Sequence, residues 1–595
     1  MPRAPAARPG VSFQRVAVVA AIVFAVLALY APVRNYPFIN LDDNEYVTDN
    51  PFVRTGLSGE NVEWALTAFH SGHWHPLTWL SLMADCQWSG TAPGALHLVN
   101  ALLGAAAAAL LFLWVESATG CFWRSAFVAA LFALHPLRVE SIAWVAARKD
   151  VLSGLFLMLA VWAWVAYAKN PSLRRYLLTM LAFALALLAK PTVAILPCGL
   201  LLLDFWPLRR RSFPGLRGAA SIAVNPREVP VGWLIAEKLP LVALAALTLR
   251  QTWAAQHAAG AVMQGYLPFP TRVANTFWHY ALYLDRTFRP LDLAVFYPLQ
   301  KVPSANAVAS ALGLVLVTIL AWRVRGKLPY VLVGWLWFVG TLLPESGIIQ
   351  FGGQAIADRY SYIPHIGLFL MLTWGAADLF ERWQVPRAAI AGVAVLLLGG
   401  LAARTSDQLG YWSSSVALFE RAIAVTDGNY MAHNNLGVAL DDLGREEDAA
   451  KHYAEAVRIN PTWPEALNNY GIALARRGQF GEARSRFEEA LRIRPAFAKA
   501  ENNLGTTYGR EQNFDEAIVH YTRALDLDGS YFDARYALGD ALERRGRFRA
   551  AEVQYREALA LRPGFAPAAA ALARVQAGIA AATGQPPQLG IGSAR

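Results

Sequence analysis

Long apolar runs alternate with short polar or basic segments over the first 405 residues of the chain. Each run approaches the length at which a helix can cross a lipid bilayer. We predict eleven membrane spans, at about 16–32, 96–115, 125–136 and 151–168, on either side of Lys190-Pro191, at 230–249 and 306–322, in a run that ends at Pro344, and at 362–382 and 388–403. The segment 271–288 is amphipathic and is predicted to lie along the outer interface. Residues 1–405 are therefore predicted to form one polytopic membrane domain.

The first span lies close to the N-terminus and resembles a signal peptide in two respects. Residues 1–32 combine a basic start with an apolar run. They lack a clear small-x-small cleavage site, and many further spans follow. We therefore expect a retained first helix.

Basic residues gather in a few short loops, and these loops orient the spans. Arg174-Arg175, Arg209 to Arg211 and Arg323 to Lys327 fall in loops that the positive-inside rule assigns to the cytoplasm. The N-terminus is then cytoplasmic, and the stretch from Asn35 to about Gly94 lies outside. With eleven spans the C-terminal region also lies outside, whereas a twelfth span at 271–288 would put it in the cytoplasm. On the outer side, this region is then periplasmic in a bacterium, or lumenal in a eukaryote. Abundant Ala and Arg are typical of a GC-rich bacterial genome and so favour a bacterial inner membrane.

Beyond residue 430 the chain repeats every 34 residues. The recurring positions are Gly437, Gly471, Gly505 and Gly539; Ala449, Ala483, Ala517 and Ala551; Tyr453, Phe487, Tyr521 and Tyr555; Ala456, Ala490, Ala524 and Ala558; and Pro461, Pro495 and Pro563. This is the pattern of the tetratricopeptide repeat (TPR), in which small residues let two helices approach and an aromatic fills the gap to the next repeat. We predict a linker with a half-repeat at 406–429, four repeats at 430–565, and a capping helix with a flexible tail at 566–595. The whole chain is thus predicted to be all-α, a membrane helix bundle followed by an α-solenoid.

Asparagines occupy one position in three successive repeats. Asn435, Asn469 and Asn503 lie in the strings NNLG, NNYG and NNLG, and Ala537 takes that position in the fourth repeat. The position faces the concave groove of such superhelices, where an amide offers a donor and an acceptor to the main chain of an extended peptide. The alternative is that these asparagines are only part of the repeat consensus.

Composition narrows the class of protein. Hydrophobic residues make up 55% of the 595 residues and charged ones only 16%, which excludes an ordinary soluble enzyme. The net charge of +10 could indicate nucleic-acid binding, but much of the basic charge lies in the loops between spans. The three cysteines are scattered and show neither metal-ligand spacing nor a disulfide framework.

The predicted outer loops hold most of the polar groups of the membrane domain. The first loop carries Asp42-Asp43, and carboxylates at the edge of a bilayer are costly enough to indicate function. The other candidates are His73, His75, His135, Glu140, Arg148, Lys149, Asp150, Lys190, Arg359 and Tyr362, and the same loops also contain Glu45, His70, Arg138, Glu345, Asp358 and Tyr360. Sugar transfer from a polyprenyl phosphate needs this mixture, because a carboxylate acts as base on the acceptor hydroxyl while arginine or lysine holds the leaving phosphate. The chain has no glycine-rich phosphate loop, which fits a donor without a soluble nucleotide.

Each of these groups also has a simpler interpretation. Arg148 and Lys149 could extend toward the interface as snorkelling side chains, and Glu140 and Asp150 could form structural bridges with neighbouring arginines. His73 and His75 could indicate a metal, but no third ligand follows at a clear spacing, so we predict no metal site. A divalent cation is therefore a possible but unsupported cofactor.

Four segments in order, the Asp42-Asp43 pair, HWHPLT, HPLRVESIAWVAARKDVLS and DRYSYIP, are followed by the repeats. In this order the chain resembles the transmembrane and TPR-containing O-mannosyltransferases and their bacterial relatives, over about residues 35–565. The resemblance implies a GT-C type glycosyltransferase fold of about eleven spans, a polyprenyl- or dolichyl-phosphate sugar as donor, and inverting transfer to a protein hydroxyl. It assigns the base to Asp42 or Asp43, and donor contacts to His135, Arg148, Asp150, Arg359 and Tyr362. Two departures, Lys149 between Arg148 and Asp150 and the HWHPL string, leave the sugar open.

Three functions are then in competition. The first is a membrane glycosyltransferase that moves mannose or another hexose to Ser or Thr on the outer face, with acceptor proteins bound in the TPR groove. The second is a non-catalytic membrane scaffold whose repeats assemble partner proteins. The third is a ligase that transfers a whole lipid-linked glycan. None of the three involves nucleic acid.

Overall fold

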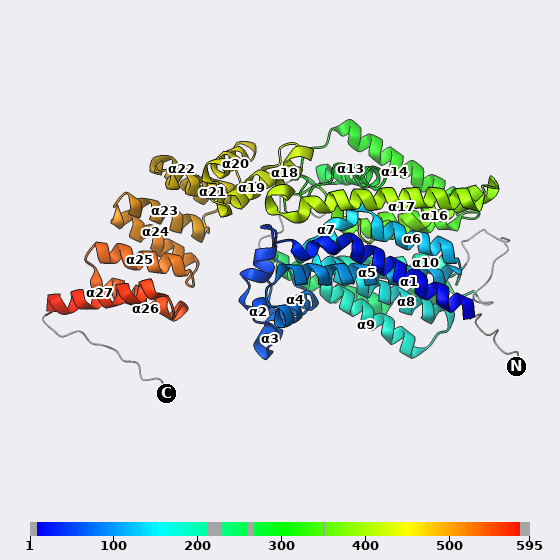
Figure 1. Ribbon diagram of the computed structural model, residues 1–595, viewed down its shortest axis with the longest axis horizontal. Coiled ribbons are helices and arrows are strands. Elements are labelled where there is room, and N and C mark those ends of the chain that lie inside the picture. The colour runs from blue at the N-terminus through cyan, green and yellow to red at the C-terminus, as the bar shows by residue number, and fades with distance from the viewer. Residues whose placement is uncertain (1–8, 212–227, 259–266, 349–351, 584–595) are drawn as a thin grey trace. The chain divides into compact units, whose positions relative to one another are not determined.

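The computed structural model describes residues 9–211, 228–258, 267–348 and 352–583. Within these residues every regular element is a helix, as predicted. The contacts divide the chain into two compact units, one up to Asp427 and one from Gly428 onward. We describe each unit by itself (Figure 1).

The first unit is a bundle of long helices joined by short ones. Its α-helices are α1 (Pro9–Tyr30), α2 (Pro51–Arg54), α3 (Gly59–Thr67), α4 (Pro76–Ser89), α5 (Pro93–Thr119), α6 (Phe122–Leu134), α7 (Val139–Ala143), α8 (Arg148–Lys169), α9 (Leu173–Ala189), α10 (Leu196–Phe205), α11 (Val231–Ala236), α12 (Leu239–Ala258), α13 (Phe269–Phe288), α14 (Ser304–Val324), α15 (Pro329–Leu342), α16 (Pro364–Arg382), α17 (Arg387–Gly410) and α18 (Ser415–Val425). The short 3-10 or π turns are η1 (Ala31–Asn35), η2 (Asn44–Thr48), η3 (Pro136–Arg138), η4 (Val145–Ala147), η5 (Pro191–Ile195), η6 (Leu343–Glu345), η7 (Asp358–Ser361) and η8 (Tyr411–Ser413).

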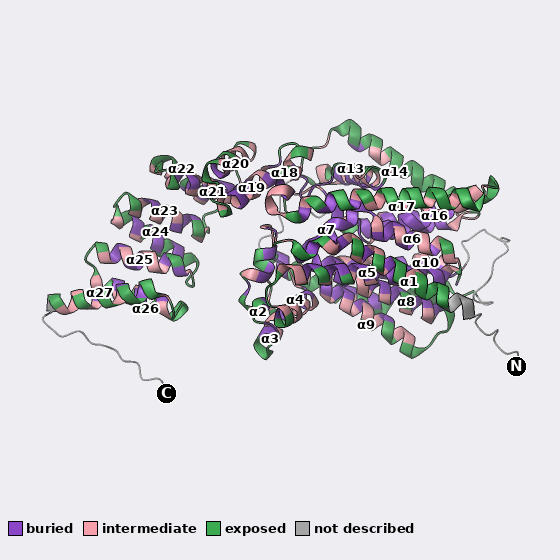
Figure 2. Ribbon diagram, viewed as in Figure 1, coloured by how far each residue is buried: buried purple, intermediate pink, exposed green. Residues whose placement is uncertain are grey.

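A helix forms at each of the eleven predicted spans, and α13 forms at the amphipathic segment. By length and composition six described helices could each cross a membrane, or seven if α6 and the bent helix after it count as one. The number of eleven spans therefore stays a prediction. The α14 and α17 helices are exposed along much of their length (Figure 2), as expected of apolar helices that face lipid.

Close helix packing explains two glycines of the bundle. A Cβ atom at Gly334 on α15 would lie 2.4 Å from the carbonyl oxygen of Gly367 on α16, and the reverse is also true. Neither position can carry a side chain without moving a backbone, because small residues let helix backbones approach closely. The turn η7, which carries part of the DRYSYIP motif, lies between α15 and α16 in the chain.

One basic loop used for orientation has a different role from the one expected. Arg210 is buried, and its guanidinium contacts Glu237 at 2.5 Å and Asp204 at 3.2 Å. Lys238 completes this buried network at 2.5 Å from Asp204. The charge of Arg210 is therefore neutralised within the protein.

The segment 136–150, expected to be an outer loop, is helical and buried. It forms η3, α7 and η4 in succession and then enters α8, so that Arg148, Lys149 and Asp150 make up the first turn of α8. The α7 helix leaves α6 with a bend of 62°. The sequence predicted only that this segment connects two spans, and the successive short helical turns within it were not predicted.

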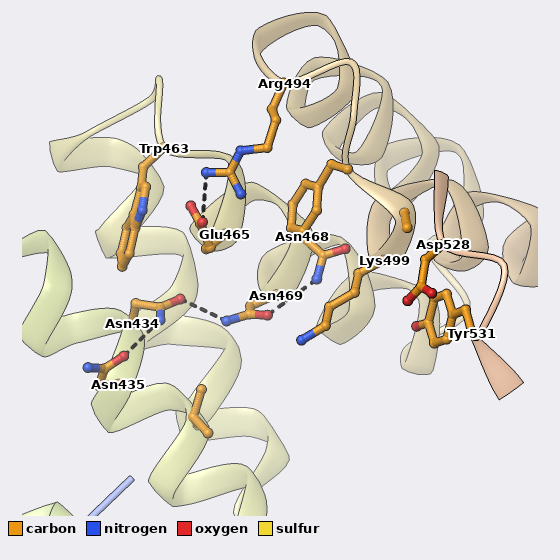
Figure 3. A pocket seen from close by; sticks show the side chains of 13 residues that line it. Asn434, Asn435, Trp463, Glu465, Asn468, Asn469, Arg494, Lys499, Asp528 and Tyr531 are labelled. Atoms are coloured by element: carbon orange, nitrogen blue, oxygen red, sulfur yellow. Dashed lines mark hydrogen bonds and ion pairs between the residues drawn. The ribbon is translucent and has the colours of Figure 1, made fainter. Parts of the chain in front are cut away.

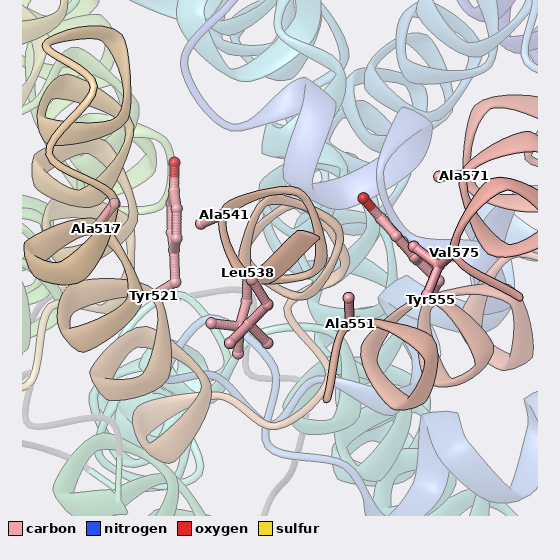
Figure 4. Close-up of a cluster of buried hydrophobic side chains, with 9 residues drawn as sticks. Ala517, Tyr521, Leu538, Ala541, Ala551, Tyr555, Ala571 and Val575 are labelled. Atoms are coloured by element: carbon pink, nitrogen blue, oxygen red, sulfur yellow. The ribbon is translucent and has the colours of Figure 1, made fainter. Parts of the chain in front are cut away.

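The second unit is the repeat array. Its helices are α19 (Tyr430–Asp442), α20 (Glu446–Ile459), α21 (Pro464–Arg476), α22 (Phe480–Ile493), α23 (Ala498–Arg510), α24 (Phe514–Leu527), α25 (Phe532–Arg544), α26 (Phe548–Leu561) and α27 (Ala566–Thr583). A Cβ at Gly471 would lie 2.6 Å from the ring of Phe487, and each equivalent glycine meets an aromatic in the same way. Ala571 and Val575 of α27 join the hydrophobic cluster of the last repeats around Tyr555 (Figure 4). The predicted half-repeat helix, α18, groups with the first unit instead.

Candidate active site and repeat groove

Asp43 lies at the start of η2, and its carboxylate accepts hydrogen bonds from the backbone. Its two oxygens accept hydrogen bonds from the Ile39 N–H at 2.9 Å and from the Ala146 N–H at 2.8 Å. The side chain is fully buried, and burial raises the pKa of its carboxyl to about 7 although the two N–H groups lower it. Asp43 therefore fastens the first outer segment to η4.

Asp42 differs from its neighbour in exposure and in hydrogen bonding. It is only half-buried, and its carboxylate accepts no hydrogen bond from a residue that the structure describes. Burial raises its pKa above the usual value, while Lys149 and Arg359 are the cations that lower it. Of the two aspartates, Asp42 is the one available to a substrate.

Lys149 is the cation of this site that has no carboxylate partner. Its ammonium group donates to the Tyr46 hydroxyl at 2.8 Å and stands over the rings of Tyr46, at 4.6 Å, and Trp144, at 5.9 Å. Among the described residues no carboxylate lies within the 4.0 Å of an ion pair. The sequence did not single out Tyr46 or Trp144, although Tyr46 follows Asp42 at helical spacing.

The remaining charges are paired with one another. Lys190 lies 2.7 Å from both Asp150 and Glu345, and its ammonium stands 5.4 Å from the ring of Tyr360. The guanidinium of Arg359 is ion-paired with Glu140, whose carboxylate also accepts from the Arg359 N–H at 2.8 Å. These two groups tie η5, η6, η7 and α7 together around Lys149.

The two histidines of the first outer segment stack on each other beside this cluster. The ring centroids of His73 and His75 are 5.3 Å apart, and His75 also packs 4.7 Å from Trp79. Burial, and then the nearby charges of Lys149, Lys190 and Arg359, lower the pKa of His73 to about 3, and burial lowers that of His75 well below its usual value. Both imidazoles are therefore neutral at physiological pH. The described part of the chain holds no group of three or more residues that could bind a metal.

Arg148 does not join the acidic pair, contrary to expectation. It is fully buried and lies 2.6 Å from Asp85. Its remaining N–H groups donate to the Ser81 hydroxyl at 2.8 Å, to the Leu96 carbonyl at 3.0 Å and to the side chain of Asn100. Every nitrogen of this guanidinium is engaged, because α8 packs Arg148 against α4 and α5, so the structure leaves it no means to hold a donor phosphate.

His135 and Tyr362 belong to a second buried cluster, centred on Arg138. The Nε2 of His135 lies 3.0 Å from the Thr287 carbonyl oxygen, and the ring of Tyr362 lies 5.0 Å from the Arg138 guanidinium. Arg138 donates to the Ser361 hydroxyl at 2.7 Å and to His365 at 2.9 Å. Of the two tyrosines in DRYSYIP it is thus Tyr360, and not Tyr362, that faces the acidic site.

In the repeat unit the asparagines form one continuous chain of side-chain hydrogen bonds. Asn503 donates to Asn468 at 2.8 Å, and Asn468 donates to Asn469 at 3.4 Å. Asn469 donates to Asn434 at 3.0 Å, which in turn donates to Asn435 at 3.0 Å (Figure 3). The sequence pointed to one asparagine in each repeat, whereas both members of each pair take part.

This chain of amides runs along the floor of a groove of about 620 Å³. Asn435 and Asn469 line the groove, and Asn503 supports it from the next repeat. The lining residues are Asn434, Asn435, Val438, Trp463, Glu465, Asn468, Asn469, Arg494, Phe497, Ala498, Lys499, Asp528 and Tyr531.

Two family models match the chain. The model described as dolichyl-phosphate-mannose-protein mannosyltransferase matches residues 89–224, and the tetratricopeptide repeat model matches 431–496 and 497–563. The first match includes Glu140, Lys149, Asp150 and Lys190 but not Asp42. The second confirms that residues 431–563 are tetratricopeptide repeats.

The chain is also similar to several curated proteins. Protein O-mannosyl-transferase TMTC1 of Homo sapiens is 24% identical over 510 residues, which cover 77% of this chain and 57% of the human protein. Protein O-mannosyl-transferase F38B6.6 of Caenorhabditis elegans is 30% identical over 127 residues, 21% of this chain and 18% of that protein. The chain thus spans little more than half the length of the human relative.

Among solved structures, YrrB, described as a TPR protein with an unusual peptide-binding site, is 23% identical with a TM-score of 0.24. The similarity covers 27% of this chain and 82% of that one. By its order of motifs, its apolar helices, its repeats and the two family matches, the chain is similar to the transmembrane, TPR-containing protein O-mannosyl-transferases.

Proposed function

We propose that the protein transfers a sugar, mannose or another hexose, from a polyprenyl-phosphate donor to a Ser or Thr hydroxyl of an acceptor protein. The reaction takes place on the outer membrane face, with the N-terminus in the cytoplasm. The observation that carries the proposal is one half-buried carboxylate without a hydrogen-bond donor, Asp42, close to one buried cation without a carboxylate, Lys149.

Asp42 acts as the general base. Its carboxylate takes the proton of the acceptor hydroxyl as the oxygen forms a bond to the anomeric carbon of the sugar. The raised pKa of Asp42 suits this role, because a base is most effective when its pKa lies near the working pH. Asp43 holds the loop in place through the backbone and does not react.

Lys149 binds the donor phosphate. As the bond between the anomeric carbon and the phosphate oxygen breaks, negative charge grows on the leaving polyprenyl phosphate. A buried ammonium group stabilises this charge more strongly than an exposed one would, because the local dielectric is low. Tyr46 fixes the position of Lys149, and the Glu140–Arg359 and Lys190–Asp150–Glu345 groups hold the surrounding turns. The neutral rings of His73 and His75 offer contacts to the sugar hydroxyls.

The repeats bind the acceptor protein. The amides of Asn435, Asn469 and Asn503 belong to a chain of hydrogen bonds that fixes their orientation before any ligand arrives. A preorganised groove loses less entropy on binding an extended peptide.

Mass spectrometry of proteins on the outer face of the membrane, taken from cells with and without this protein, tests this function. A hexose on Ser or Thr that depends on the chain is the expected result. Exchange of Asp42 for Asn should lower transfer by about 10²- to 10⁴-fold. Asp49→Asn, at an exposed carboxylate of the same outer segment, is the matched control and should leave transfer unchanged.

Each alternative predicts a different result. A chain-dependent mass equal to a whole oligosaccharide would identify a glycan ligase. Absence of any added sugar, with partner proteins still bound through the repeats, would identify a scaffold. Full transfer by the Asp42→Asn variant would refute the catalytic assignment.

A further inference from the structure

A row of aromatic side chains accompanies the asparagines in the groove. Trp463, Phe497 and Tyr531 follow one another at intervals of 34 residues, and each stands directly before the first helix of a repeat. All three line the groove and are half-buried, so part of each ring can contact a ligand (Figure 3). The repeat period therefore sets one aromatic ring in each of three successive repeats along the same groove.

The asparagine chain presents donors to this groove. Asn469 and Asn503 each use one amide N–H within the chain of hydrogen bonds, and each side-chain amide has two. Among the described residues the second N–H of these two amides has no acceptor, and of the two only Asn469 lines the groove. A ligand with exposed carbonyl groups would supply the acceptors.

Two cations and two carboxylates line the groove: Arg494 and Lys499, with Glu465 and Asp528. Arg494 is ion-paired with Glu465 at 2.7 Å. Lys499 is exposed, lines the groove two residues after Phe497, and forms no ion pair with a described residue. A carboxylate of the ligand would complete its pairing.

We propose that the groove recognises an extended, polyproline II-like segment whose proline rings pack against Trp463, Phe497 and Tyr531 and whose acidic residue meets Lys499. A polyproline II segment has no internal hydrogen bonds, so its carbonyls are open to the asparagine amides, and proline adds no N–H that would need an acceptor. Aromatic-lined grooves bind such segments in other proteins for the same reason. Segments rich in Ser, Thr and Pro are also typical O-glycosylation substrates. The proposal rests on the assignment of the groove to the acceptor protein and names the class of acceptor.

Fluorescence anisotropy with the full-length protein in detergent tests this recognition without any sugar donor. The probe is a fluorescein-labelled 12-residue peptide of Ser and Thr with proline at every third position and one Glu. The control peptide carries alanine in place of each proline. We expect the proline peptide to bind at least fivefold more tightly, because its extended conformation is preformed.

Single substitutions separate the contribution of the aromatic row from that of the asparagine chain. Trp463→Ala or Phe497→Ala should weaken binding of the proline peptide about tenfold and that of the alanine peptide much less. Asn469→Ala should weaken both peptides to the same degree, because its amide contacts the main chain. Lys499→Gln should weaken the peptide that carries Glu, whereas Lys451→Gln, on α20 and paired with Asp448, is the matched control. Tyr531→Ala serves as the second aromatic variant if either of the first two loses its helical melting transition.

Equal affinity for the two peptides, or aromatic variants that bind normally, would overturn the proposal. Displacement of the probe by a free mannose oligosaccharide would also overturn it and would make the groove a carbohydrate site. Failure of the transferase assay with intact proline-dependent binding would leave this inference standing and refute only the catalytic function.

Discussion

The ammonium group of Lys149 donates to the hydroxyl of Tyr46 at 2.8 Å, and among the described residues it meets no carboxylate. The neighbouring lysine, Lys190, is held by Asp150 and Glu345, both at 2.7 Å. Two lysines of the same cluster thus differ in what they can bind. The ammonium group of Lys149 can pair with an anionic ligand, whereas the charge of Lys190 is neutralised by Asp150 and Glu345.

Substitution of Lys149 should change donor binding, whereas substitution of Lys190 should change the stability of the fold. Lys149→Gln should raise the KM for the lipid donor about tenfold or more and leave thermal stability nearly unchanged, because it removes a charge that has no partner. Lys190→Gln should destabilise the protein by about 3 kcal/mol or more, since it leaves two buried carboxylates uncompensated. Donor kinetics and thermal unfolding in the same detergent measure both. A comparable loss of stability in both variants would contradict the assignment of Lys149.

Arg148 should behave as a structural residue. Arg148→Lys breaks a buried network with Asp85, Ser81 and Asn100, so it should lower the unfolding free energy by about 3 kcal/mol. Any remaining folded enzyme should bind the donor with an unchanged KM. A stable Arg148→Lys variant with a raised KM would instead place the donor phosphate at Arg148.

Asp43 should give the fold a defined pH dependence. Its pKa in the folded protein is raised from the ordinary 3.8 to about 7, so the fold favours the protonated carboxyl. The stability from this group is complete below about pH 4 and is lost as the pH rises through about 7. Asp43→Asn removes the titration. The difference in unfolding temperature, wild type minus variant, should therefore fall between pH 4 and pH 8, and a difference that rises over this range would contradict the burial of Asp43.

Two glycines of the second repeat should respond differently to alanine. A Cβ at Gly471 would lie 2.6 Å from the Phe487 ring, so Gly471→Ala should destabilise the array by about 1–3 kcal/mol through overpacking. Gly481 lies in α22 with no atom within 4 Å of the added Cβ. Gly481→Ala is the matched control and should be neutral or stabilising by up to about 1 kcal/mol. Thermal unfolding of the full chain measures both changes, and equal effects would mean that the Gly471–Phe487 contact does not limit packing.

Much of the fold could be predicted because the signals are local. An apolar run of span length and a 34-residue repeat both show in a single stretch of chain, and helices formed where they were expected. The short helical turns between α6 and α8 were not predicted, for the opposite reason. Short helical turns such as η3 and η4 depend on burial against other helices, which a local pattern does not contain.

Local patterns in the sequence predict the helical class, the positions of the apolar helices, the repeat array and the resemblance to the protein O-mannosyl-transferases. They also place the acidic pair and the basic groups in the same set of segments. Which of these groups meet depends on tertiary packing. Packing pairs the Asp43 carboxylate with two backbone N–H groups and leaves Asp42 available to a substrate. It buries Arg148 in a separate network. It also brings Tyr360, rather than Tyr362, to the site. Adjacent residues of one chemical type differ in the groups that packing brings to them, and many of those groups are distant in the chain: Ala146 lies 103 residues from Asp43, and Asn100 lies 48 residues from Arg148.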